Sequence, residues 1–92
     1  MKSIISNEHK CFICGRTDWI ECHHIYGGAN RKVSEQNGFK VYLCHYCHNE
    51  PPNGVHHNKE NSLYLKQLCQ KEFEKTHTRE EFMKLIGQNY LD

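Results

Sequence analysis

The chain has 92 residues, with 12 lysine and arginine residues against 11 aspartate and glutamate residues and a net charge of +1 at pH 7. This length accommodates one domain and leaves no room for a second hydrophobic core. The near-neutral charge excludes a nucleic-acid binder that depends on a broadly basic surface, because phosphate affinity scales with the number of charges neutralised. Contact with DNA would be local and transient, which fits an enzyme better than a repressor.

The chain is rich in cysteine and histidine and poor in core-forming residues. It holds six cysteines and eight histidines, and only 37% of its residues are hydrophobic. A chain this short with so small a core usually needs disulfides or a structural metal ion. No apolar run predicts a signal peptide or a membrane span, so we expect a cytoplasmic protein without membrane contact. In a reducing compartment, CxxC pairs favour zinc ligation over a disulfide framework.

The first half of the chain predicts a β-hairpin. Residues 1–9 predict a short arm or an edge strand. Residues 19–26 alternate aromatic, branched and polar side chains, which predicts a strand, and residues 39–43 predict a second one. The two strands are expected to pair across a long connection.

That connection opens with the glycine-rich segment 27–32, which we predict to be a loop. Its adjacent cations, Arg31 and Lys32, are candidate contacts to nucleic-acid phosphates. The alternative is a solvated turn that carries surface charges. Segment 34–37 is polar, and Gly38 is predicted to end it.

The second half of the chain predicts two helices. Turn-forming residues fill segment 51–54. From about Lys59 the hydrophobic positions recur with helical spacing, at Leu65, Leu68, Cys69 and Phe73. A capping box from Thr78 to Glu81 predicts the start of a short helix, which Gly87 is expected to end.

Two CxxC pairs predict a structural zinc site. The pairs are Cys11 with Cys14 and Cys44 with Cys47, and 29 residues separate them. Two residues between thiolates let both sulfur atoms reach one tetrahedral ion. A redox motif is the alternative for a single CxxC, but it requires an α/β pattern that this chain lacks. Cys22 and Cys69 have no spaced partner, so we expect them to be small buried apolar residues.

Adjacent histidines close the first predicted strand. Neighbouring residues of a strand point to opposite faces, so His23 and His24 are suited to different roles. One could bind a metal ion while the other faces an attacking water molecule. A neutral imidazole, with an ordinary pKa of about 6.5, can accept a proton at cellular pH. The alternative is a strand end whose imidazoles merely bond to the backbone.

These motifs resemble the HNH endonucleases, whose site is a ββα-metal hairpin and helix. The resemblance covers residues 11 to about 57 and is carried by the CxxC pairs, His23-His24-Ile25, Asn37-Gly38, Leu43-Cys44-x-x-Cys47-His48 and His56. The loop 27–31 and the helical tail are similar to those of short HNH proteins encoded by phages and prophages. The resemblance implies an α+β fold, a small zinc-stapled ββα-metal domain in a single unit 1–92. Its core would be 11–57 and its C-terminal helical extension 58–92.

The resemblance also implies roles for individual residues. His24 matches the general base that activates water, and His23 matches the first metal ligand. Asn37 matches the middle asparagine that braces the strand bearing the base. The four cysteines of the two CxxC pairs, here called the knuckle cysteines, match the zinc-binding pairs found in many members of the family.

His48 and His56 match the remaining metal ligands. Pro51-Pro52 lies between them, so one continuous helix cannot bear both. His57 is therefore an alternative third ligand, and His48 could instead support the zinc knuckle.

The implied activity is metal-dependent hydrolysis of DNA phosphodiester bonds by an endonuclease with a histidine base. Its cofactors would be structural Zn²⁺ and a catalytic divalent ion: Mg²⁺, Mn²⁺, Ni²⁺ or Zn²⁺. An imidazole-rich ligand set favours zinc, nickel, cobalt or manganese over magnesium. The expected setting is the cytoplasm of a phage-infected or prophage-bearing bacterium. The expected partners are DNA and either a second copy of the chain or a larger phage protein.

The alternative function is a catalytically silent zinc module that binds nucleic acid or a protein. Such a module could assist phage DNA packaging or recombination, or inhibit a host defence system. His24 discriminates between the two, because a binding module does not need an imidazole there. A zinc-ribbon transcription factor, the third interpretation, would carry more positive charge and no His-His-Ile segment.

Overall fold

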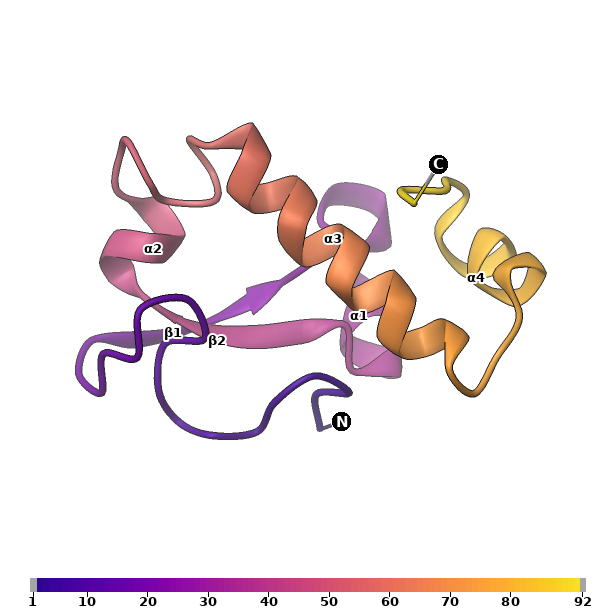
Figure 1. The fold of residues 1–92 in the computed structure, drawn as a ribbon, viewed down its shortest axis with the longest axis horizontal. Coiled ribbons are helices and arrows are strands. Elements are labelled where there is room, and N and C mark those ends of the chain that lie inside the picture. Colours follow the sequence, from indigo (N-terminus) through magenta and orange to yellow (C-terminus); the bar gives the residue numbers. More distant parts are fainter. Residues whose placement is uncertain (1, 92) are drawn as a thin grey trace.

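The computed structural model describes residues 2–91 and has an α+β architecture with one two-stranded antiparallel sheet. The helices and strands are, in order, β1 (Ile20–His24), the 3₁₀ helix η1 (Gly28–Asn30), α1 (Arg31–Asn37), β2 (Lys40–Cys44), α2 (His45–Asn49), α3 (Lys59–Glu74) and α4 (Arg79–Ile86). In Figure 1, α3 lies diagonally across the hairpin, with α2 towards one end of the molecule and α4 towards the other. None of the helices in the described part of the chain is long and apolar enough to cross a membrane.

The predicted hairpin is confirmed. The first strand is shorter than expected, at 20–24 instead of 19–26, and the second is shifted by one residue, to 40–44 from 39–43. The strands pair in antiparallel register, with His23 opposite Val41 and Glu21 opposite Leu43. Side chains alternate between the two faces of the sheet, so His23 is buried with Val41 and Leu43, whereas the adjacent Cys22 is exposed. The sheet therefore turns one histidine of the pair inward.

The connection between the strands is helical, in η1 and α1, which corrects the loop predicted at 27–32. The polar segment 34–37 lies in α1, and Gly38 ends it as predicted. Ser34 anchors the helix, since its hydroxyl donates to the carbonyl of Tyr26 at 2.7 Å and accepts from the Tyr26 N–H at 3.2 Å. Gly38 ends α1 in a left-handed conformation with φ of 74°. A side chain at Gly38 would also collide with the carbonyl of Lys2. No hydrophobic periodicity marks this helix, because its single buried position, Ser34, is polar.

The helical tail and the hairpin share one hydrophobic core. The buried apolar residues are Cys11, Ile25, Tyr26, Phe39, Val41, Leu43, Cys44, Val55, Leu65, Cys69, Phe73, Phe82 and Ile86. Tyr26, Phe39, Phe73 and Phe82 form an aromatic cluster with ring centroids 5.5–6.1 Å apart. Because α3 and α4 contribute half of this cluster, the tail is an integral part of the domain core.

The predicted helix boundaries are confirmed by their caps. Asn58 accepts from the N–H of Asn61 at the start of α3. Thr78 and Glu81 form the predicted capping box of α4. Gly87 ends α4 with φ of 86°.

The N-terminal residues form an arm beside β2, as one of the two alternatives predicted. The N–H of Ile4 donates to the carbonyl of Gly38 at 3.0 Å, and the hydroxyl of Ser3 donates to the carbonyl of Lys40.

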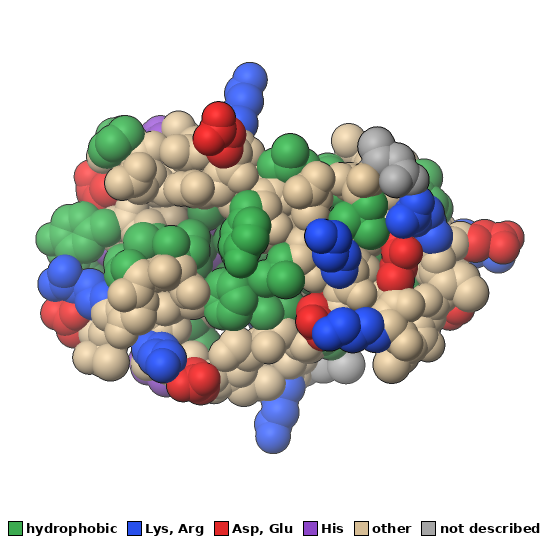
Figure 2. All heavy atoms as spheres, viewed as in Figure 1, with side chains coloured by type: hydrophobic (Ala, Val, Ile, Leu, Met, Phe, Trp, Pro, Cys, Tyr) green, Lys and Arg blue, Asp and Glu red, His purple; other side chains and the backbone are tan. Residues whose placement is uncertain are grey.

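On the face of the molecule in Figure 2, basic and acidic side chains are interspersed and form no continuous basic surface. This arrangement agrees with the net charge of +1.

Candidate metal centres

The two CxxC pairs come together as one group. Sulfur atoms from Cys11, Cys14, Cys44 and Cys47 all lie within 4.8 Å of one another. The sulfurs of Cys14 and Cys44 are 3.7 Å apart. A tetrahedral zinc ion with Zn–S bonds of about 2.3 Å places its sulfurs about 3.8 Å apart. The group could therefore hold a structural zinc ion, as the spacing predicts.

The hairpin geometry explains why the pairs meet. The first pair lies in a turn before β1, held by the N–H of Phe12 donating to the carbonyl of Tyr42 at 2.9 Å. The second pair begins at the last residue of β2 and continues into α2. Because β1 and β2 are antiparallel, the start of β1 lies beside the end of β2, and the two pairs face each other.

The electrostatics of the group favour at least one thiolate. Burial opposes ionisation of Cys11, but backbone N–H groups of Cys14, Cys44 and Ile13 outweigh it and lower its pKa to about 6. Burial and the neighbouring thiols raise the pKa of Cys47. A bound cation would favour the thiolate form of all four, because the thiolate is the metal ligand.

Three histidines form a second group. The structure brings ring nitrogens of His23, His48 and His56 within 4.8 Å of one another. The Nε2 atoms of His48 and His56 are 3.0 Å apart. Ligands bonded at about 2.1 Å to one ion are separated by about 3.0 Å in octahedral and 3.4 Å in tetrahedral geometry. The donor set fits a divalent ion with open coordination positions for water or substrate.

The segment between α2 and α3 places His56 beside the other two histidines of the group. It folds back over α2, so that the N–H groups of Val55 and His56 donate to the carbonyls of Cys47 and His48 at 2.8 and 3.3 Å. Gly54 permits this close approach, since a Cβ there would lie 2.6 Å from the carbonyl oxygen of Glu50. His48 and His56 therefore meet without lying on one continuous helix. The ligand group contains His56 and does not include the alternative candidate, His57.

A carboxylate orients the second histidine. Glu21 lies on the inner face of β1, and its Oε1 is 2.8 Å from Nδ1 of His48. This contact leaves Nε2 of His48 directed at the other two histidines. The same carboxylate reaches Nδ1 of His45 at 3.1 Å, and Glu50 holds the opposite nitrogen at 2.8 Å. Carboxylates in this position behind a histidine fix its tautomer and strengthen its metal bond.

The first histidine is prepared for ligation by its environment. His23 is only 6% exposed. Burial, followed by the charges of His48 and His56, lowers its pKa to about 3. Its imidazole is therefore neutral at pH 7, with a lone pair available to a metal ion.

The adjacent histidine belongs to a different contact. Nε2 of His24 lies 3.4 Å from Oε1 of Glu35 on α1, and the other carboxylate oxygen of Glu35 pairs with Lys40. The hydrogen bond from Lys40, followed by the one from His24, lowers the pKa of Glu35 to about 2. The division of the two histidines between opposite faces therefore agrees with the strand argument.

Other predicted site residues lie apart from the histidine group. Asn37 ends α1, and its amide donates to the carbonyl of Val33 at 2.9 Å. Within residues 2–91, no hydrogen bond joins Asn37 to His24. Arg31 and Lys32 are exposed on the first turn of α1. The structure therefore does not bring these three residues to the ligands.

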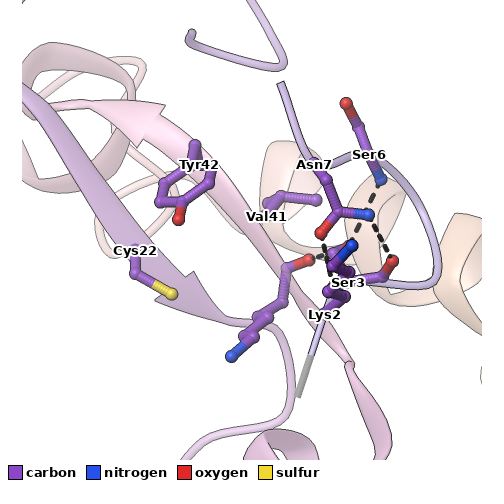
Figure 3. A pocket seen from close by; sticks show the side chains of 8 residues that line it. Lys2, Ser3, Ser6, Asn7, Cys22, Val41 and Tyr42 are labelled. Atoms are coloured by element: carbon purple, nitrogen blue, oxygen red, sulfur yellow. Dashed lines mark hydrogen bonds between the residues drawn. The ribbon is translucent and has the colours of Figure 1, made fainter. Parts of the chain in front are cut away.

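The two unpaired cysteines differ from each other. Cys69 is fully buried in the core, as predicted. Cys22 is exposed, which corrects the expectation for it. It lines a pocket of about 310 Å³ between the N-terminal arm and the hairpin, together with Ser3 and Tyr42 (Figure 3). Neither cysteine joins a ligand group in the described part of the chain.

Sequence reasoning missed the carboxylates that hold the histidines. Glu21 could have been found, because a residue two positions before His23 shares its face of the strand. Glu35 carried no such signal, since its approach to His24 depends on the unpredicted helix α1.

Comparisons with protein-family models, curated proteins and solved structures gave no match to this chain.

Proposed function

We propose that the protein is a metal-dependent DNA endonuclease with a ββα-metal, HNH-like site. The observation that carries the proposal is the convergence of three imidazoles, with 3.0 Å between two of their Nε2 atoms, beside a second and separate group of four cysteines. The motif resemblance supplies DNA as the substrate class. The hairpin followed by α2 supports a ββα arrangement, because β1 carries one ligand and α2 another.

His23, His48 and His56 would hold the divalent ion. When bound, the ion neutralises charge on the scissile phosphate and assists departure of the leaving oxygen. Glu21 keeps His48 in the ligating tautomer through the bond to Nδ1. Imidazole ligands favour zinc, nickel, cobalt or manganese over magnesium.

His24 would act as the general base. Its Nε2–H donates to the carboxylate of Glu35, which leaves the lone pair of Nδ1 to take a proton from the attacking water. Lys40 holds the other oxygen of that carboxylate, which fixes the orientation of the pair. Hydrolysis of a phosphodiester requires an oriented base close to a metal-binding group.

The test is nicking of supercoiled plasmid with Mg²⁺, Mn²⁺, Ni²⁺ or Zn²⁺ added in turn to zinc-loaded protein. We expect His24→Ala to lower the nicking rate about 10²-fold or more, the scale of general-base catalysis. His9→Ala is the matched control, because His9 is exposed, belongs to neither ligand group and does not line the pockets beside the histidines. Equal nicking by wild type and a folded His24→Ala protein would remove His24 as the base. No cleavage of duplex, single-stranded or branched DNA by wild type would overturn the proposal.

A second candidate function is a zinc-stapled module that binds nucleic acid or protein without catalysis. The exposed aromatic side chains of Trp19 and Tyr46, which are 56% and 46% exposed and whose ring centroids are 5.3 Å apart, favour it. Exposed aromatic groups of this kind mark interaction surfaces. Under this function His24→Ala would bind its partner as wild type does, and no metal ion would support cleavage.

A further inference from the structure

A polar pocket opens beside the three histidines. It has a volume of about 390 Å³ and is lined by His23 and His56, by the Gly27–Gly28 backbone, and by Ser62 and Lys66 of α3. A second pocket, of about 340 Å³, adjoins it and shares Ser62 and Lys66. Helix α3 therefore forms a wall common to both.

The residues that α3 presents to these pockets follow helical spacing. Lys59, Ser62 and Lys66 occupy positions i, i+3 and i+7 and so share one face of the helix. We call these three residues the α3 stripe. Lys59 lines the second pocket with His57, whereas Ser62 and Lys66 line both pockets. The stripe runs from the second pocket towards the histidine group.

Lys66 is held in place from two sides. Its backbone carbonyl accepts a hydrogen bond of 2.6 Å from the hydroxyl of Tyr26, which lies two residues after His24. Its ammonium lies 5.5 Å from the ring centroid of Tyr90, and that ring stacks on Tyr26. These contacts tie the position of Lys66 to the end of β1.

The two pockets are suited to anions. Of the lining residues that the structure describes, none is an aspartate or a glutamate in either pocket. Within residues 2–91, neither Lys59 nor Lys66 forms a salt bridge, whereas Lys10, Lys40 and Lys75 each pair with a carboxylate. Two unpaired ammonium groups on one helix face, with a hydroxyl between them, match successive phosphates of a nucleic-acid strand.

We propose that the α3 stripe is the phosphate-binding surface of the protein. Lys66 and Ser62 contact a phosphate in the histidine pocket, and Lys59 contacts the next phosphate of the same strand in the adjoining pocket. This inference rests on the proposed function, since it names where the substrate backbone lies. It assigns substrate binding to the helical tail and not to Arg31 and Lys32.

The test measures binding of two probes to zinc-loaded protein. The first probe is thymidine 3′,5′-bisphosphate, which has no internucleotide diester bond that could be cleaved. Its binding is measured by titration calorimetry. The other is a fluorescein-labelled oligonucleotide, followed by anisotropy from 50 to 200 mM salt with His24→Ala in every protein to prevent cleavage. We expect Lys66→Gln to weaken binding of both probes about tenfold and to lower the slope of log K against log salt by about 1. Lys66→Arg should retain the wild-type slope.

Lys71→Gln is the matched control, because it removes the same charge from an exposed position of α3 outside both pockets. Equal affinities and salt slopes for Lys66→Gln and Lys71→Gln would overturn the stripe. Plasmid nicking by the protein with wild-type His24 separates the two proposals. If it nicks DNA while the two lysine variants bind alike, the stripe fails and the nuclease stands. If it neither binds the oligonucleotide nor nicks, both fail.

Discussion

Replacing one knuckle cysteine should unfold the domain, and Cys14→Ser is the most informative change. Cys14 is exposed, so the substitution removes a candidate metal ligand and little packing. Its sulfur lies 3.7 Å from that of Cys44, within the four-cysteine group. The loss of stability therefore reports the metal contribution and not a cavity.

The expected loss approaches the whole stability of the domain. At about 0.05–0.15 kcal/mol per residue, 92 residues correspond to roughly 5–14 kcal/mol. A structural zinc site supplies an apparent binding free energy of about 10–16 kcal/mol. If the variant loses only about 5 kcal/mol of this, its Tm falls by at least about 20 °C, since each kcal/mol is worth about 4–8 °C in a domain of this size.

Zinc content, thermal unfolding by circular dichroism and tryptophan emission give three independent measurements. Trp19 is the only tryptophan in the chain. It stacks on His45 with a centroid separation of 4.6 Å, and its carbonyl accepts from the His45 N–H at 2.9 Å. Because Trp19 follows the first cysteine pair and His45 lies within the second, loss of zinc should separate the rings and change the emission.

Cys22→Ser is the matched control, since it makes the same chemical change at an exposed cysteine outside the ligand group. It should keep one structural zinc ion per chain and a Tm close to wild type. The reasoning is refuted if Cys14→Ser retains wild-type zinc content, Tm and emission, or if Cys22→Ser loses the ion.

Three further predictions concern the histidine group and its surroundings. Glu21→Gln should weaken binding of a divalent ion at the histidine group about 10–100-fold, because it alters the acceptor on His48; calorimetric titration with Ni²⁺ checks this, and unchanged affinity contradicts it. Gly54→Ala should lower the free energy of unfolding by about 1–3 kcal/mol, measured by thermal unfolding, because the added methyl group meets backbone atoms at 2.6 Å. It should also weaken binding of the same divalent ion, while the zinc content of the four-cysteine group stays unchanged. The pKa of Glu35 is lowered to about 2, chiefly by Lys40, so its contribution to stability is present above its unfolded pKa of about 4.5 and is lost as pH falls towards 2. The Tm of Glu35→Gln should therefore fall less than that of wild type between pH 5 and pH 3. If the two plots of Tm against pH run parallel, the ion pair makes no such contribution.

Local sequence determined the four-cysteine group and the hairpin. A CxxC spacing lets two sulfurs reach one ion whatever surrounds them. Period-two alternation identifies a strand without knowledge of its partner, and antiparallel pairing then carries Cys11 and Cys14 to Cys44 and Cys47. Helix caps such as Thr78 with Glu81 act within four residues, so they too could be identified in advance.

Only the tertiary structure decided which histidines meet and what holds them. The choice of His56 over His57 depends on a segment folding back on α2, and that path requires Gly54 to lie against the backbone of Glu50. The contact of Glu35 with His24 depends on α1, whose single buried residue left no periodic pattern to find. Lys66 reaches the histidine pocket because the core docks α3 across the hairpin. Glu35 is far from His24 in the chain, and Lys66 is far from His23, so these positions follow from packing and not from spacing.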